Sequence, residues 1–209
     1  MGQRSQIYVR ITDEKGNKYL IAKYFQWNYG ERMISRARYG IDYVKKQNGY
    51  VGLDSVREQI DEIFNVNFDM KDYLHTTDII KEWLVYGEKW EVEFKDFVFY
   101  NQDNNDGKLF IDIKENCNEI KYCFTDYNLK IFKNPKEYMN WDCEGWLESE
   151  YYTKSVLNKC LNNIQKIEKN AILMTEKELK DFINDDYTEF LNKKKEKIDK
   201  EIKYLKGEY

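Results

Sequence analysis

The sequence is poor in residues that interrupt or crosslink a chain: its 209 residues include one proline, ten glycines, four cysteines and one histidine. It has no apolar run that approaches the ~18 residues of a membrane span, and its N-terminus lacks the apolar core of a signal peptide. These absences exclude collagen-like and linker-like chains and argue against a secreted protein. We therefore expect a cytoplasmic protein with free thiols and no membrane partner.

The scarcity of histidine and the scattered cysteines also limit the possible chemistry. A zinc site needs closely spaced ligands, but Cys117, Cys123, Cys143 and Cys160 form no CxxC pair, and His75 is the only histidine. His75 would also have to serve any Ser or Cys dyad, and no phosphate-binding glycine loop is present. The sequence predicts no metal, no cofactor and no catalytic residues.

What the sequence does contain is apolar and aromatic residues, 42% and 16% of the chain, enough for a substantial core. Its net charge of −4 is unevenly distributed. Residues 1–50 carry ten basic and four acidic side chains, a balance of +6, whereas residues 51–126 carry eight basic and eighteen acidic ones, a balance of −10. Two explanations of this uneven charge are open. Either the solvated faces of the protein merely differ in charge, or its basic end and its acidic middle contact different partners.

The N-terminal quarter predicts a β-hairpin followed by a helix. Residues 6–13 alternate apolar and polar side chains, which is typical of a strand with one buried face. Residues 14–17 predict a turn, and residues 18–29 a second strand that ends at Gly30. The apolar residues of the helix that follows recur every three or four positions and are Ile34, Ala37, Ile41 and Val44.

The middle of the chain predicts a second helix over residues 54–64, then a short apolar run of uncertain type over residues 78–86. Alternation returns at residues 90–99, with a one-residue slip that indicates a bulge near Lys95 and Asp96. Two further strands, over residues 109–113 and 120–124, would complete an antiparallel meander spanning residues 88–126.

Helix dominates the C-terminal part, residues 134–206. Asn134 followed by Pro135 predicts a helix start, and Thr175 with Glu178 fits a capping box. The last helix is long enough to pack on a partner. We therefore predict one α+β domain over residues 1–209, made of the hairpin and helix of residues 1–50, the meander and this helical part.

The acidic residues in the predicted meander are better explained as solvated side chains than as ligands of a metal ion. An EF-hand register with Gly107 at the sixth position would put Ile113, instead of a glutamate, at the twelfth, so a solvated turn is favoured at residues 101–107. Glu91 and Glu93 are expected on the outer, wet face of a strand.

The segment richest in candidate binding residues is 24–43. Its helix carries Arg32, Arg36, Tyr39 and Tyr43 on one side, and one face of the preceding strand carries Gln26 and Asn28. Guanidinium and aromatic groups at a helix N-terminus suit a phosphate-bearing ligand, a nucleic-acid strand or an acidic partner protein. The alternative is an aromatic core whose arginines pair with the acidic middle of the chain.

Two stretches of the N-terminal region resemble a known group of proteins. The opening M-G-Q-R-S-Q-I-Y-V-R and the later Y-F-Q-W-N-Y-G look like small uncharacterised proteins of phages and mobile elements, over about the first 50 residues. Those proteins often carry His before the Trp, where this chain has Gln26, so no histidine-based activity is transferred. The resemblance implies an accessory gene in a setting where inhibitors of host immunity, including anti-CRISPR proteins, are common.

Three functions remain open on this evidence. The first is a binding protein that inhibits a host defence complex by occupying a protein or nucleic-acid surface, with a host protein or ribonucleoprotein as its partner. The second is an enzyme acting on a nucleotide or nucleic acid, with N-terminal arginines holding phosphate. The third is a small-ligand or structural module unrelated to defence.

Overall fold

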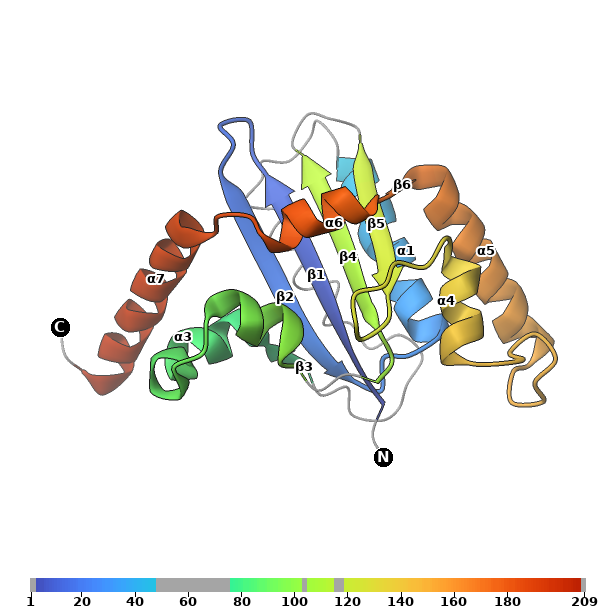
Figure 1. The fold of residues 1–209 in the computed structure, drawn as a ribbon, viewed down its shortest axis with the longest axis horizontal. Coiled ribbons are helices and arrows are strands. Elements are labelled where there is room, and N and C mark those ends of the chain that lie inside the picture. The colour runs from blue at the N-terminus through green and yellow to red at the C-terminus, as the bar shows by residue number, and fades with distance from the viewer. Residues whose placement is uncertain (1–2, 48–75, 103–104, 115–118, 208–209) are drawn as a thin grey trace.

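The computed structural model describes residues 3–47, 76–102, 105–114 and 119–207, and it has the predicted α+β character, with strands first and a helical C-terminal part (Figure 1). The described elements are β1 (Arg4–Thr12), β2 (Lys18–Gln26), α1 (Glu31–Gln47), β3 (Thr76–Asp78), α3 (Ile79–Trp90), η1 (Asp96–Tyr100), β4 (Lys108–Lys114), β5 (Ile120–Thr125), α4 (Pro135–Asp142), α5 (Lys154–Asn170), β6 (Ile172–Leu173), α6 (Glu176–Ile183) and α7 (Thr188–Lys206).

The strands form one mixed sheet with the order β3-β2-β1-β4-β5-β6. β1 and β2 pair as the predicted antiparallel hairpin, and β4 and β5 form a second one. The two hairpins join through a parallel pairing of β1 with β4. This non-local pairing places the start of the chain at the centre of the sheet.

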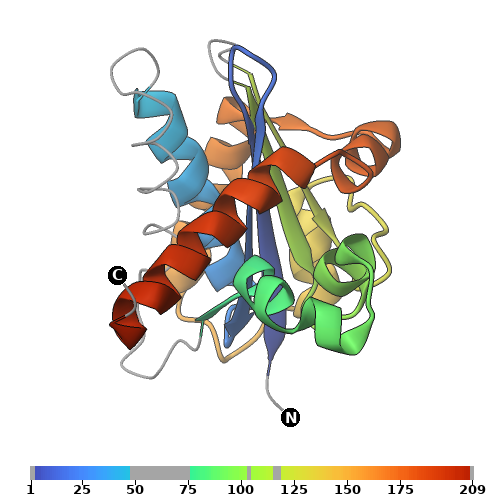
Figure 2. The ribbon, with the colours of Figure 1, turned by 90° about the vertical axis from the view of Figure 1, so that its left-hand side faces the viewer.

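Helices cover both faces of the sheet, which Figure 2 shows nearly edge-on. On one face α1, α4 and α5 pack against Ile7 and Val9, and on the other α3, η1 and α6 pack against Tyr8. The prediction that only one face of the first strand is buried is therefore wrong. Arg10 lies on the second face and pairs with Asp112 of β4 at 2.6 Å, so its charge is buried with a partner.

The predicted meander over residues 88–126 is wrong in its first half. Residues 79–90 form helix α3, and residues 96–100 form the π-helix η1, in which the N–H of Asn101 donates to the carbonyl of Asp96 at 2.8 Å. The bulge at Lys95 and Asp96 therefore does not exist, and Glu91 and Glu93 lie in the non-helical turn that follows α3. The strands of the second half are present as β4 and β5.

The predicted starts of the C-terminal helices are confirmed. The side chain of Asn134 accepts a 2.9 Å hydrogen bond from the N–H of Glu137, with Pro135 in the first turn of α4. Thr175 and Glu178 form the complete capping box of α6. The helix predicted over residues 54–64, His75 and Cys117 lie outside the described residues, and the described cysteines are free thiols. No helix in the described part of the chain is long and apolar enough to cross a membrane.

Candidate functional site

The turn between β2 and α1 carries the exposed Trp27 beside the half-buried Tyr29 and Arg32, and these three residues are called here the Trp27 patch. Trp27 is 42% exposed and has a left-handed backbone, with a φ of 61°. Its N–H donates to the carbonyl of Gln3 at 2.7 Å, and its carbonyl accepts from Nη1 of Arg32 at 2.8 Å. The Arg32 guanidinium lies 4.8 Å from the centre of the Tyr29 ring. These contacts hold the two aromatic residues and the cation close together.

Two residues predicted to belong to the binding surface, Arg36 and Asn28, are buried instead. Nε of Arg36 donates to Oδ1 of Asn28 at 2.7 Å, and its guanidinium lies 4.9 Å from the centre of the Phe25 ring. Asn28 also donates to Oγ of Ser5 at 3.1 Å. Burial, together with the charge of Arg32, lowers the pKa of Arg36 to about 10. Arg36 is therefore held inside the protein, and one of its partners is the side-chain amide of Asn28.

The other predicted site residues do not gather around Arg32. Tyr39 is exposed and stacks with Arg38, whose Nε pairs with Asp42 at 2.8 Å. Tyr43 packs against the core beneath α1, and Gln26 is half-buried at the end of β2. The predicted set is thus split between surface and interior, and of its six members only Arg32 belongs to the Trp27 patch.

The N-terminus of α1 is already occupied by a carboxyl group of the protein itself. Oδ2 of Asp142, the last residue of α4, accepts a 2.6 Å hydrogen bond from the N–H of Gly30. A phosphate at this position would be held by this N–H and by the helix dipole. Because Asp142 already accepts from the N–H, the structure argues against the hypothesis of a phosphate-binding site here.

The half-buried carboxyl of Asp142 is hydrogen-bonded to the buried carboxyl of Asp106, a residue for which the sequence predicts a solvated turn. Burial and the charge of Asp106 raise the pKa of Asp142 to about 7, and burial also raises the pKa of Asp106. Oδ2 of Asp106 accepts from the N–H of Arg4. The pair thus fastens the start of β1 and the start of α1 to the end of α4.

The thiol next to this pair, that of Cys143, has a raised pKa. Cys143 contacts the hydroxyl of Tyr152 at 3.4 Å, and burial raises the pKa of the thiol to about 12. Thiolate is the reactive form of cysteine, so a raised pKa keeps Cys143 inert near neutral pH. Among the described residues, no group of three or more His, Cys, Asp and Glu side chains is placed to hold a metal ion.

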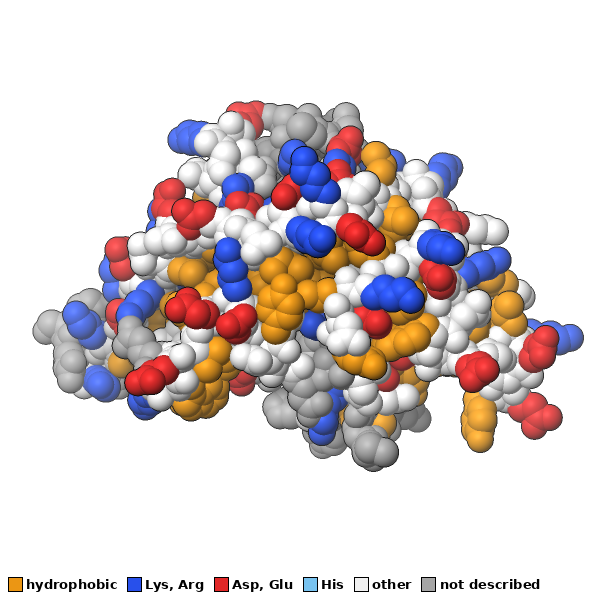
Figure 3. All heavy atoms as spheres, in the orientation of Figure 1, with side chains coloured by type: hydrophobic (Ala, Val, Ile, Leu, Met, Phe, Trp, Pro, Cys, Tyr) orange, Lys and Arg blue, Asp and Glu red, His pale blue; other side chains and the backbone are white. Residues whose placement is uncertain are grey.

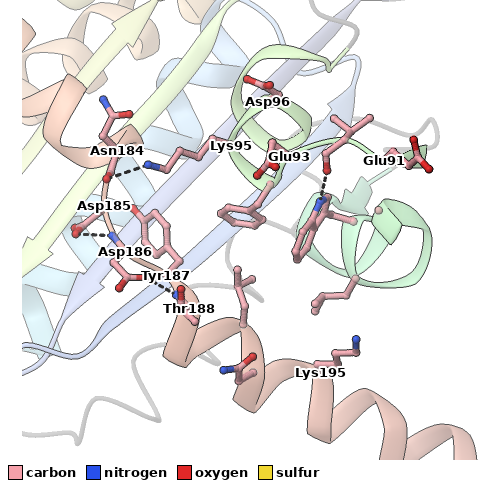
Figure 4. A pocket seen from close by; sticks show the side chains of 17 residues that line it. Glu91, Glu93, Lys95, Asp96, Asn184, Asp185, Asp186, Tyr187, Thr188 and Lys195 are labelled. Carbon is pink, nitrogen blue, oxygen red and sulfur yellow. Dashed lines mark hydrogen bonds between the residues drawn. The ribbon is translucent and has the colours of Figure 1, made fainter. Parts of the chain in front are cut away.

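A groove of about 1080 Å³ lies on the other face of the sheet, between the segment joining α3 to η1 and the segment joining α6 to α7. Figure 4 shows Glu93, Lys95 and Asp96 on one wall and Asn184 to Thr188 on the other. Nζ of Lys95 donates to the carbonyl of Asn184 at 3.1 Å and ties the two walls together. The half-buried apolar side chains in the groove are Trp83, Leu84, Val92, Phe94 and Leu191.

Sequence reasoning missed this groove because it assigned one wall to a strand. In the W-E-V-E-F-K-D-F stretch, residues 90–97, carboxylates alternate with large apolar side chains. In a strand, that alternation predicts an outer, solvated face that carries the carboxylates. In the structure, apolar and acidic side chains line the same groove.

No family model, curated protein or solved structure matches this chain. Its function is therefore inferred from its own residues and their geometry.

Proposed function

We propose that this chain is an accessory protein of a phage or mobile element that inhibits a host defence complex of the CRISPR type. In this proposal it acts in the cytoplasm as a binding protein and occupies a protein or nucleic-acid-binding surface of the complex. The resemblance of the N-terminal region supports the setting, and the Trp27 patch supports the mode of action.

The observation that carries the proposal is the exposed, left-handed Trp27 beside Arg32. Trp, Tyr and Arg are the residues most enriched at the energetic centres of protein interfaces, and all three types meet here. A bulky residue with positive φ is strained by about 1–3 kcal/mol, and such strain concentrates at functional sites. A solvent-facing tryptophan held in this way favours a role in binding over one in packing.

The proposal is tested by purifying a tagged form of the full chain from a host with an active CRISPR system, before and after nuclease treatment. We expect the intact defence complex to co-purify in both cases, and the protein to raise the plating efficiency of a targeted phage. The variant Trp27→Ala with Arg32→Ala should lose both effects while it remains folded.

A matched control removes an aromatic residue and a lysine that are both exposed, Tyr151→Ala with Lys154→Ala, which lie before and at the start of α5. This control should behave as the unmodified chain does. Equal recovery of the complex with both double variants, or recovery of bare nucleic acid alone, would contradict the proposal.

A further inference from the structure

We propose that the groove between α3 and α7 binds a lysine- or arginine-containing segment of a partner protein that also presents apolar side chains. This second binding surface is separate from the Trp27 patch, because α1 and α3 lie on opposite faces of the sheet (Figure 2). The proposal therefore does not depend on the function proposed above.

The floor of the groove supplies apolar surface for such a segment. The rings of Trp83 and Phe94 pack edge to face, with 5.0 Å between their centres. The ring of Phe94 also contacts that of Tyr187, with 6.1 Å between their centres. Nε1 of Trp83 donates to the carbonyl of Val92 at 3.2 Å, so the polar atom of the indole is satisfied within the protein. Figure 3 shows apolar side chains at the surface among charged ones on the face that carries α3 and α6.

The rim of the groove is acidic. Glu91, Glu93 and Asp96 are exposed, and none of them forms an ion pair with any other described residue. Asp186 on the opposite wall is also exposed, and its Oδ1 accepts from the N–H of Thr188 at 2.9 Å. Lys95 and Lys195 also line the groove, so its carboxylates outnumber its cations. An excess of carboxylates around an apolar floor attracts a cation and repels phosphate, which favours a basic peptide over a nucleic acid.

The size and the rigidity of the groove also fit a peptide. Its volume of about 1080 Å³ lies just above the typical range for small-molecule pockets, about 300–1,000 Å³. Its walls are tied to each other by Lys95 and Asn184, and α7 is tied to the start of α3 by an ion pair between Lys194 and Asp78 at 2.8 Å. A groove that is already formed loses little free energy to ordering when a segment binds.

The test uses a fluorescein-labelled amphipathic peptide of lysine and leucine, and the same peptide with glutamate in place of lysine, measured by fluorescence anisotropy against the full chain. We expect the lysine peptide to bind and the glutamate peptide not to bind. The double variant Glu91→Lys with Glu93→Lys reverses the charge of the rim and should weaken binding of the lysine peptide by about tenfold or more.

The matched control, Glu148→Lys with Glu150→Lys, makes the same change in net charge at two exposed positions between α4 and α5 and should change the affinity less than about twofold. The neutral pair Glu91→Gln with Glu93→Gln should give an intermediate loss, which keeps the test valid if the charge reversal disturbs the fold. Arg32→Ala should leave peptide binding unchanged. Equal weakening by the rim and control variants, equal binding of both peptides, or no binding at all would overturn the proposal.

Discussion

Nε of Arg36 donates a 2.7 Å hydrogen bond to Oδ1 of Asn28 in the interior of the protein. The sequence assigns both residues to a binding surface. Arg36 is 2% exposed and Asn28 is fully buried. Since buried polar groups that lose their partners are costly, this hydrogen bond contributes to the docking of α1 onto the turn that carries Trp27.

Arg36→Ala should therefore lower the free energy of unfolding by about 1–3 kcal/mol, because it leaves the Asn28 carbonyl oxygen without this donor. Arg32→Ala should cost about 1 kcal/mol or less, since Arg32 is only half-buried. Urea unfolding of both variants measures the difference. If the two variants lost the same stability, the assignment of Arg36 to the scaffold and Arg32 to the surface would be wrong.

The sequence was sufficient to locate the β1–β2 hairpin, α1 and the helix caps, because these depend on residues close together in the chain. It was not sufficient to orient Arg36. The alternation along β2 placed Asn28 on the same face as Gln26, but the left-handed backbone at Trp27 breaks the alternation and turns Asn28 towards Arg36. A conformation that most residues avoid has no signature in a hydrophobic pattern.

The prediction of a meander over residues 88–126 is wrong for a different reason. Over residues 90–99 the apolar residues alternate for only a few positions, a length at which a strand and a short helix cannot be distinguished. Phe97, Val98 and Phe99 are all buried against the sheet, so packing against Tyr8 and Phe110 determined the structure of this segment. The parallel pairing of β1 with β4 is equally invisible in the sequence, because it joins segments about a hundred residues apart.

Ile41→Ala tests the packing of α1 on the sheet. Ile41 is fully buried in the core formed by α1, α5 and the strands, so removing three of its carbon atoms should lower the free energy of unfolding by about 2–5 kcal/mol. Tyr39→Ala, at an exposed position of the same helix, should cost much less. The comparison is made by denaturant unfolding, and a cost below about 0.5 kcal/mol for Ile41→Ala would contradict the observed helical phase.

The backbone strain at Trp27 predicts an unusual order of stability among its variants. Trp27→Gly and Trp27→Ala both remove the indole, but only glycine adopts a φ of 61° without steric cost. We expect the glycine variant to be more stable than the alanine variant by about 0.5–1 kcal/mol, the reverse of the usual effect of glycine. Thermal unfolding of both proteins measures this difference, and greater stability of the alanine variant would show that the turn is not strained.

The carboxyl pair of Asp106 and Asp142 predicts that stability decreases as the pH rises. The pKa of Asp142 is raised to about 7 in the folded protein, by burial first and then by the charge of Asp106, whereas an unfolded Asp titrates near 3.8. Between these two values the folded state keeps a proton that the unfolded chain has released. The free energy of unfolding should therefore fall as the pH rises from about 4 to about 7.

Asp142→Asn should remove this dependence, because the amide resembles the protonated carboxyl and its oxygen still accepts from the N–H of Gly30. We expect little change in stability at pH 4 and a gain of about 1 kcal/mol or more at pH 8, since one unit of pKa difference corresponds to about 1.4 kcal/mol. Asp199→Asn, at an exposed position of α7, is the matched control and should leave the pH dependence unchanged. Urea unfolding at pH 4, 6 and 8 makes the measurement. A loss of stability at pH 8 would mean that Asp142 acts as a carboxylate that the start of α1 requires.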